Sequence, residues 1–109
     1  MFGTEIAIGP GKADLLESIA ASGSISESAR RLGMSYRRAW LLVDTMNRCF
    51  REPVVASATG GSGGGGAQVT PFGRTVLARY RVLERYDAMR ARVDRAIDPE
   101  LERFAELLR

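Results

Sequence analysis

Hydrophobic and polar positions repeat with a helical period in two neighbouring stretches of the chain, residues 24–33 and 35–50. In the first stretch, Ser24 and Glu27 have the S-x-x-E spacing of a capping box, in which each side chain accepts a hydrogen bond from the other residue's backbone amide. Gly33 can adopt the left-handed conformation that closes a helix. The pattern predicts a short helix whose apolar side contains Ile25, Ala29 and Leu32.

The second stretch predicts a helix with two contrasting faces, and Ser35 offers its N-cap. At about 100° per residue, we expect one face to be buried and to anchor the helix through its tryptophan; this face contains Tyr36, Ala39, Trp40, Val43, Met46 and Phe50. The opposite face contains Arg37, Arg38, Leu41, Thr45 and Arg48, flanked by Asp44. Two short helices joined by a tight turn, the second with donors directed outward, are typical of a helix-turn-helix that enters the DNA major groove. A merely solvated helix also has a charged outer face, so this pattern alone leaves nucleic-acid binding open.

The segment before these helices predicts a supporting element for a three-helix core. Residues 2–8 alternate loosely and indicate a short strand, and residues 9–11 (Gly-Pro-Gly) indicate a turn. A helix is expected from Lys12 until Ser22-Gly23, with apolar positions at Leu15, Leu16, Ile19 and Ala20.

The segment after Phe50 predicts a β wing. Pro53 is expected to stop the preceding helix. Short strands are predicted at residues 54–56 and 68–70, joined by the glycine-rich residues 58–67. A wing of this composition would let its backbone approach DNA phosphates closely. The glycine run could also be a flexible linker, or a nucleotide-binding loop, although the lysine of that motif is missing.

A long helix is predicted from Pro71, with Thr70 as its cap. Its apolar stripe continues to Ile97, which is further than a small core requires, so we expect the helix to pair with that of a second copy. The alternative is that it folds back onto its own domain. A last short helix follows Asp98-Pro99, and its apolar side is expected to complete the dimer contact. The expected dimerisation residues are Val76, Tyr80, Leu83, Tyr86, Val93, Ile97, Phe104 and Leu108.

Length and composition agree with a small protein of mainly α structure with a β wing (an α+β fold). The 109 residues suffice for one modest core, which we divide into a winged helix-turn-helix at residues 1–70 and a linker and dimerisation segment at residues 71–109. No apolar run reaches the roughly 18 residues of a membrane span, and the N-terminus has no secretory signal pattern. The single cysteine, Cys49, cannot form an internal disulfide, which fits a cytoplasmic protein.

The net charge of +3 is unevenly distributed. Residues 30–51 hold six arginines and one acid, and residues 71–97 hold seven arginines and three acids. A concentration of positive charge on the second half of a helix-turn-helix indicates a polyanionic partner.

Together these segments resemble the DNA-binding domain of ModE-type molybdate-responsive regulators. The match covers roughly residues 12–80, and the Ser-Tyr-Arg-Arg-Ala-Trp segment combined with the glycine-rich wing is specific to that family. The Thr-Pro-x-Gly pattern is similar to the start of the linker helix in LysR-type regulators. The segments that carry the resemblance are residues 23–26, 35–40, 46–47, 58–67 and 70–73.

The resemblance implies a homodimer that binds double-stranded DNA, with two recognition helices reading a palindrome and the wings touching the flanking backbone. It also implies that residues 35–38 open the recognition helix and residues 59–67 form the wing. The expected DNA-binding residues are Ser24, Ser26, Ser35, Tyr36, Arg37, Arg38, Leu41, Arg48, Thr59, Gly61, Ser62, Gly63 and Gly64.

The sequence also departs from the family in three ways. Family wings often hold a basic residue where this chain has Ser62, so wing–phosphate attraction is expected to be weaker. The outward Leu41 replaces a more polar type, which indicates a thymine-methyl contact or an altered site. Full-length members carry C-terminal molybdate-binding domains, whereas this sequence ends at Arg109. We therefore expect no molybdate-binding domain, and either another signal, constitutive DNA binding or a separate sensor protein as partner.

Other function classes find less support in the sequence. The chain has no histidine, no cysteine–base pair and no evident pair of catalytic acids, so we expect no enzyme, no metal site and no cofactor. A fold does not fix a function, and the alternative is a protein-interaction or architectural winged-helix module.

Overall fold

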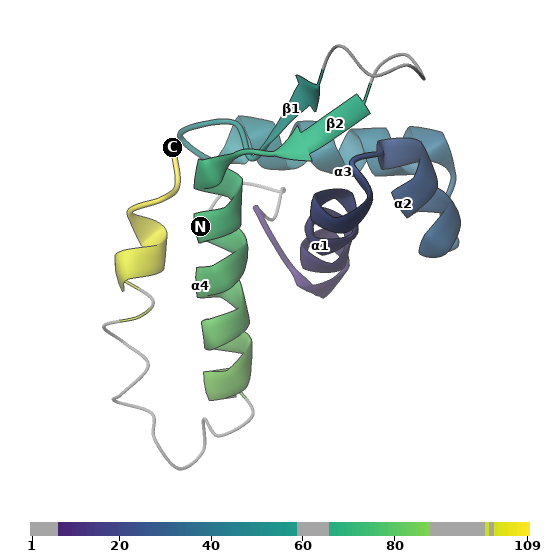
Figure 1. Cartoon of the computed structure of the whole chain (residues 1–109). Helices are drawn as coiled ribbons and strands as arrows, with labels where there is room; N and C mark the ends of the chain where they lie inside the picture. The colour runs from purple at the N-terminus through teal and green to yellow at the C-terminus, as the bar shows by residue number, and fades with distance from the viewer. Residues whose placement is uncertain (1–6, 59–65, 88–99, 101) are drawn as a thin grey trace.

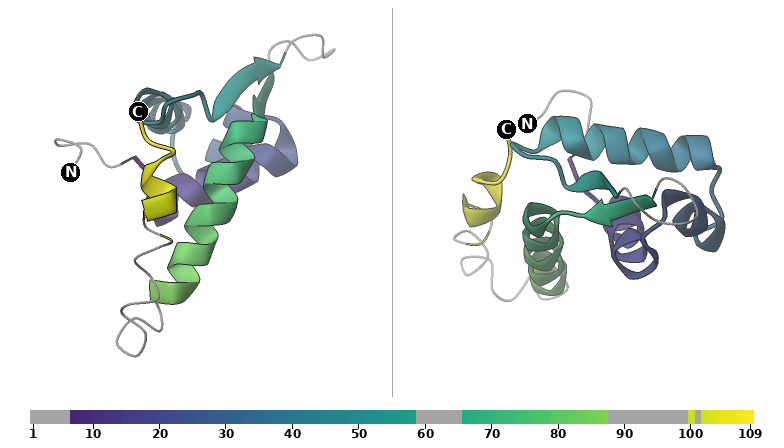
Figure 2. Two further views of the ribbon diagram at one scale, coloured as in Figure 1. Left: turned by 90° about the vertical axis from the view of Figure 1, so that its left-hand side faces the viewer. Right: turned by 45° about the horizontal axis from the view of Figure 1, so that its top comes forward.

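The computed structural model describes residues 7–58, 66–87, 100 and 102–109. Its elements in chain order are α1 (Pro10–Ser22), α2 (Ile25–Arg31), α3 (Tyr36–Cys49), β1 (Val55–Ala58), β2 (Gly66–Val69) and α4 (Pro71–Asp87). The three N-terminal helices lie together, the two-stranded sheet runs alongside α3, and α4 extends away from the end of β2 (Figures 1 and 2). The fold is mainly helical with a small antiparallel sheet, as predicted, and the arrangement is a winged helix-turn-helix.

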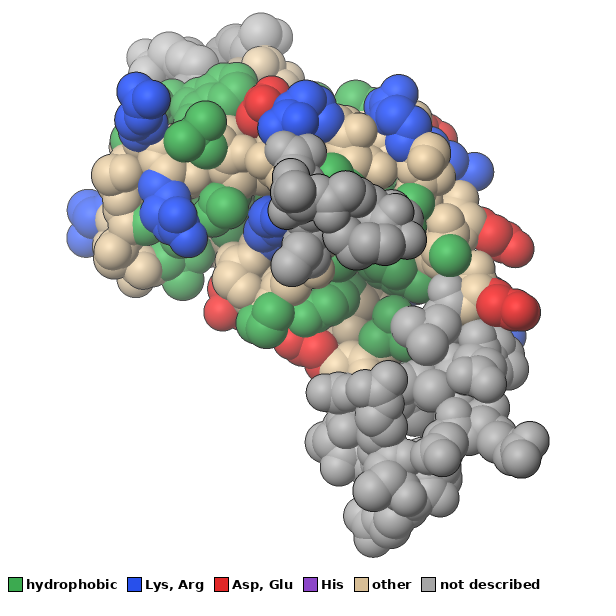
Figure 3. Space-filling model, turned by 180° about the vertical axis from the view of Figure 1, so that it is seen from behind, with side chains coloured by type: hydrophobic (Ala, Val, Ile, Leu, Met, Phe, Trp, Pro, Cys, Tyr) green, Lys and Arg blue, Asp and Glu red, His purple; other side chains and the backbone are tan. Residues whose placement is uncertain are grey.

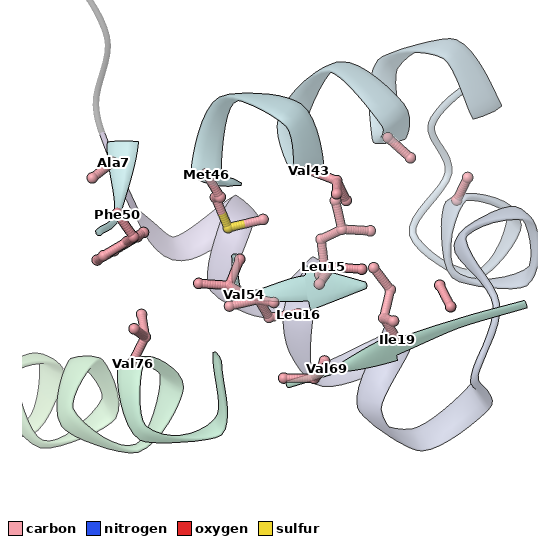
Figure 4. Close-up of a cluster of buried hydrophobic side chains, with 14 of the residues drawn as sticks. Ala7, Leu15, Leu16, Ile19, Val43, Met46, Phe50, Val54, Val69 and Val76 are labelled. Carbon is pink, nitrogen blue, oxygen red and sulfur yellow. The ribbon is translucent and has the colours of Figure 1, made fainter. Parts of the chain in front are cut away.

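Every one of these elements except α2 contributes a large side chain to a single core. In Figure 4 the labelled side chains of α1, α3, β2 and α4 point toward one another. The largest fully buried side chains are Phe50, Leu15, Leu16, Ile19, Met46, Val54 and Val76. The supporting helix α1 therefore packs beneath α3 and β2, as the three-helix interpretation required.

The start of α1 differs from the expectation. The predicted turn at residues 9–11 is wrong, because α1 begins at Pro10 and includes Gly11. Proline suits the first helical position, where its missing N–H would have no helical partner. The predicted strand at residues 2–8 lies mostly outside the described residues; Ala7 and Ile8 belong to no strand, although Ala7 is buried.

The turn from α2 to α3 follows the predicted capping signals with one exception. The Ser24 hydroxyl accepts from the Glu27 backbone N at 2.9 Å, and Gly33 adopts the left-handed conformation at φ +70°. The reciprocal half of the capping box is replaced, since the Ser24 backbone N donates to Ser22 Oγ at 3.2 Å. The Glu27 carboxylate instead binds Arg30 and Arg31 within α2.

The inner face of α3 is narrower than predicted. Tyr36 and Trp40, expected in the core, are 54% and 47% exposed, whereas Ala39, Val43 and Met46 are buried. At about 100° per residue, the two aromatic residues lie at the edge of the apolar stripe. They consequently face the side of the helix along which the wing runs, and the prediction that tryptophan anchors α3 is wrong.

The start of α4 is fixed by contacts that the sequence signals. The Thr70 hydroxyl accepts from the Gly73 backbone N at 2.8 Å and donates to the Pro53 carbonyl at 2.7 Å. Gly73 is buried, and a Cβ there would lie 2.2 Å from the Val54 carbonyl oxygen, so no side chain fits. The first turn of α4 is thus held directly against the start of the wing.

Further along, α4 is tied to α1. The Arg81 guanidinium bridges to Asp14 at 3.1 Å and also contacts Glu17, while it pairs with Glu84 of its own helix at 2.8 Å. These hydrogen bonds raise the pKa of Arg81 above its ordinary value, and the one to Glu84 contributes most. Burial raises the pKa of the neighbouring Tyr80 hydroxyl.

The structure also bears on the proposed dimerisation stripe. Val76 is fully buried inside the protomer, so it is removed from the expected dimer contact. Phe104 packs edge-on against Phe50 with ring centroids 6.0 Å apart, and Leu108 forms an isolated antiparallel bridge with Phe50. The C-terminal segment therefore folds onto the end of its own α3. Residues 88–99, with Val93 and Ile97, lie outside the described part of the chain, as does the side chain of Tyr86.

Among the helices described, none has the length and apolar character needed to cross a bilayer.

Candidate nucleic-acid interface

The outward face of α3 is presented by a well-capped helix. The Ser35 hydroxyl accepts from the Arg38 backbone N at 3.1 Å, which fixes the first turn. Arg37, Arg38 and Leu41 are exposed, and Leu41 has 55% of its surface accessible. Figure 3 shows Lys and Arg side chains spread over the part of the molecule where α3 lies, with hydrophobic side chains between them.

The arginines near this face differ in how their charge is compensated. Arg48 pairs with Asp44 at 3.0 Å, and Arg30 and Arg31 share Glu27. By contrast, no acidic side chain among the described residues pairs with Arg37 or Arg38. Two uncompensated guanidiniums therefore stand at the N-terminal end of α3, where they can meet phosphate oxygens or guanine edges.

The α2 pairs make a separate, neutralised patch. Hydrogen bonds from Arg30 and then Arg31 lower the pKa of Glu27, and the same contact raises the pKa of Arg30. Glu27 therefore stays ionised at neutral pH. Its charge offsets one of the two arginines, which leaves α2 less attractive to a polyanion than the start of α3.

The wing is attached to α3 through the side chain of Asn47. Its Oδ1 accepts from the backbone N of Val54 at 2.8 Å and of Val55 at 3.2 Å. Its Nδ2 donates to the Val55 carbonyl at 3.1 Å. Asn47 thereby completes the backbone hydrogen bonds at the start of β1 and sets the position of the wing relative to α3.

A second attachment joins the wing to the turn before α2. The strands pair in register from Val55 with Val69 to Ala58 with Gly66. The backbone N of Ala67 donates to the Gly23 carbonyl at 3.0 Å. Because both strands are anchored, the wing base is a rigid extension of the helix-turn-helix.

Between the start of α2, α3 and the wing lies a hollow of about 350 Å³, which we call the aromatic hollow. Tyr36 and Trp40 form its α3 wall, and Trp40 Nε1 donates to the Tyr36 hydroxyl at 3.0 Å. Its remaining lining comes from Ser24, Ile25, Ser26, Val43, Asn47, Val55, Ala56, Ser57, Gly66 and Ala67.

The structure brings most of the expected DNA-binding residues to one side of the molecule. Arg37, Arg38, Leu41 and Arg48 are exposed on α3. Ser24, Ser26 and Tyr36 line the aromatic hollow beside them, while Ser24 and Ser35 also serve as helix caps. The expected wing contacts Thr59, Gly61, Ser62, Gly63 and Gly64 lie outside the described residues.

The sequence did not predict that Asn47 joins α3 to the wing, or that Trp40 and Ser57 line the aromatic hollow. At about 100° per residue, Tyr36, Trp40 and Asn47 form a stripe between the core face and the arginine face. A polar residue at the end of such a stripe is a signal for a side-chain contact with the next element, here β1. Ser57 gave no signal of its own, because its place depends on the pairing of the wing strands.

Comparison with known proteins gives several relatives. The chain is 37% identical to the molybdenum transport protein ModE of Azotobacter vinelandii over 99 residues, 86% of this chain and 37% of that protein. It is 43% identical to the molybdenum-pterin-binding protein MopA of Rhodobacter capsulatus over 77 residues, 71% of this chain and 29% of that protein. It is also 43% identical to the DNA-binding transcriptional dual regulator ModE of Escherichia coli K12 over 74 residues, 68% of this chain and 28% of that protein.

No protein-family model matches the chain. The chain spans between 28% and 37% of the length of these three relatives, so the comparison concerns one part of each. Over that part the identity is high enough to establish homology, and the fold supplies the recognition helix and wing that such a domain requires. The chain is therefore homologous to the ModE-type regulators over the region it shares with them, and its winged helix-turn-helix is consistent with a ModE-type N-terminal DNA-binding domain.

Proposed function

We propose that this chain is a DNA-binding transcription regulator that acts as a homodimer on a palindromic site. The observation that carries the proposal is the pair of uncompensated guanidiniums, Arg37 and Arg38, at the start of a capped recognition helix. A bidentate arginine–guanine contact is worth about 1–3 kcal/mol of discrimination against the wrong base. Relatives named as transcriptional regulators support the DNA-binding part of this proposal.

Arg48 and Leu41 take supporting roles in this proposal. Arg48 is held by Asp44, so we expect it to contribute to general attraction more than to base recognition. The exposed Leu41 is suited to the methyl group of thymine, which offers the apolar contact of the major groove. The wing would touch the backbone beside the site.

Selection from genomic fragments with the purified protein tests DNA recognition directly. The proposal predicts enrichment of an inverted repeat, with an affinity that falls steeply as salt rises because phosphate contacts release counterions. Parallel selections with and without molybdate are informative, because several relatives are named for molybdenum. Undetectable or salt-insensitive DNA binding would contradict the proposal and favour a protein-interaction module.

The homodimer is proposed through the distal part of α4 and the residues that follow it. Tyr80 and Leu83 of α4 are half-buried in the protomer, so each keeps surface available for a partner. Sedimentation analysis of the wild type and of Leu83→Asp tests the proposal. We expect a dimer for the wild type and a shift toward monomer for the variant, while Arg85→Asp, on the exposed side of α4, should stay dimeric.

A further inference from the structure

The aromatic hollow contains an unusual pair of exposed side chains. Trp40 and Tyr36 are 47% and 54% exposed, although large aromatic surfaces gain most when buried. The hydrogen bond from Trp40 Nε1 to the Tyr36 hydroxyl fixes both rings at one wall of the hollow. It also satisfies the polar atom of the indole, so the exposed ring surface that remains is apolar. The pair is therefore ordered before any partner binds.

Among the residues that the structure describes, the other walls carry hydroxyl groups and no charged side chain. Ser24 and Ser26 come from the start of α2, and Ser57 comes from β1 of the wing. The Tyr36 hydroxyl accepts from Trp40, so its own hydrogen can be donated outward. Serine and tyrosine hydroxyls are common donors to DNA phosphate oxygens. A ligand with an apolar ring and an adjacent acceptor group fits this combination.

Charge and position indicate where such a ligand comes from. The hollow lies between α3 and the wing, and Arg37 and Arg38 stand on the same helix as its aromatic wall. If α3 enters the major groove, the strand that borders the groove on the wing side must cross this hollow. A sugar–phosphate unit offers a deoxyribose ring and phosphate oxygens, which are the two chemistries that the lining provides.

On the basis of the proposed DNA-binding function, we propose that the aromatic hollow binds one sugar–phosphate unit of that strand. The deoxyribose lies against the Trp40 indole. The phosphate oxygens accept hydrogen bonds from the hydroxyls of Tyr36, Ser26 and Ser57. Because these contacts do not read bases, the site positions the recognition helix on DNA and contributes equally to every sequence.

The intrinsic fluorescence of Trp40 reports on the site, because the chain contains one tryptophan. Binding of a dye-labelled duplex is followed by anisotropy, and acrylamide quenching of Trp40 is measured on the same complex. We expect the duplex to shift the emission to the blue and to reduce quenching, whereas inorganic phosphate alone should do neither. Failure of the duplex to bind would overturn the proposed function itself. A bound duplex with unchanged Trp40 quenching would overturn this inference alone.

Truncation of the aromatic wall gives a second test. We expect Trp40→Ala to weaken binding of cognate and random duplexes by a similar factor, about tenfold. Leu32→Ala is a matched control, since it removes another exposed apolar side chain outside the hollow. Both variants should remain folded, with an unfolding transition as cooperative as that of the wild type, because both side chains are partly exposed. An unchanged affinity of Trp40→Ala, or a loss confined to the cognate duplex, would contradict the inference.

Uncharged substitutions in the DNA backbone locate the phosphate that the aromatic hollow is proposed to bind. Single methylphosphonates are placed along each strand of the duplex, and affinity is measured with the wild type and with Ser57→Ala. The inference predicts one position at which the two changes are strongly non-additive, because the hydroxyl and the phosphate oxygen would form one contact. Additive effects at every position would show that Ser57 does not contact the backbone.

Discussion

The large apolar side chains of α3 lie in different environments at its two ends. Tyr36, Trp40 and Leu41 in the first half are about half exposed, whereas Met46 near the other end and the C-cap residue Phe50 are fully buried. Charge follows the same division, since Arg37 and Arg38 have no acidic partner among the described residues while Arg48 is held by Asp44. The N-terminal end of α3 is thus accessible to solvent, whereas its C-terminal end packs against the rest of the protein.

Residues from distant parts of the chain hold the C-terminal end of α3 in place. Phe50 packs edge-on against Phe72 and Phe104, with ring centroids 6.3 and 6.0 Å away. The backbone N of Arg109 donates to the Cys49 carbonyl at 3.1 Å, and its guanidinium Nε donates to the Phe50 carbonyl at 3.0 Å. These donors satisfy carbonyls at a helix end, where the helix itself provides none. A rigid base is what allows the opposite end to keep a fixed geometry.

The largest effect on stability is expected from Phe50→Ala at the C-terminal end of α3. The substitution removes a fully buried aromatic ring and two ring–ring contacts, so we expect a loss of about 3–5 kcal/mol in the free energy of unfolding. Chemical denaturation followed by circular dichroism measures it. A loss below about 1 kcal/mol would show that the end of α3 is not the anchor.

The next effect concerns the junction between α3 and the wing. Asn47→Ala leaves the backbone N–H groups of Val54 and Val55 without their acceptor, which should cost about 1–3 kcal/mol of stability. Amide hydrogen exchange should also speed up at these two residues more than at Ile19 in α1. Equal exchange rates in the variant and the wild type would mean that Asn47 does not hold the wing.

A smaller effect on stability is expected at the N-terminal end of α3. Ser35→Ala removes the side-chain acceptor of the Arg38 backbone N and should lower stability by about 1 kcal/mol. Because the first turn of α3 would then fray, DNA affinity should fall as well. Ser57→Ala, a serine that caps no helix, provides the control for stability and should leave the unfolding midpoint unchanged.

A still smaller effect on folding than that of Ser35→Ala is expected for Leu41→Ala. Leu41 is 55% exposed and outside the core, so the change in stability should stay within about 0.5 kcal/mol. Its effect should appear instead in DNA selection, as a weaker preference for thymine at one position of the site. Stability loss as large as that of Asn47→Ala would place Leu41 in the packing of the protein.

The features that the sequence predicted well are those fixed by neighbouring residues. Ser24, Ser35 and Thr70 each cap the helix that follows, and Gly33 closes α2, because a cap or a left-handed turn depends on the next three or four residues. The Thr-Pro-x-Gly segment belongs to the same group, although the reason for its glycine, the approach of the Val54 carbonyl, became visible in three dimensions.

The features that the sequence did not predict depend on elements far apart in the chain. Trp40 was assigned to the core from helical spacing, and spacing cannot tell a core from a wing at the edge of an apolar stripe. The docking of Phe104 onto Phe50 joins residues 54 positions apart, so no local pattern distinguishes it from a dimer contact. The aromatic hollow was missed for the same reason, since residues of α2, α3 and both wing strands form its walls.

We propose that the guanidiniums at the start of α3 read DNA rather than stabilise the protein, and Arg38→Ala separates these two roles. The affinities of this variant for a selected site and for random duplex are compared with those of Arg85→Ala, which removes an equal charge from the exposed side of α4. We expect an unchanged unfolding midpoint and a loss of about 1–3 kcal/mol on the selected site beyond the loss on random DNA. Equal losses on both duplexes, or the same result for Arg85→Ala, would contradict it.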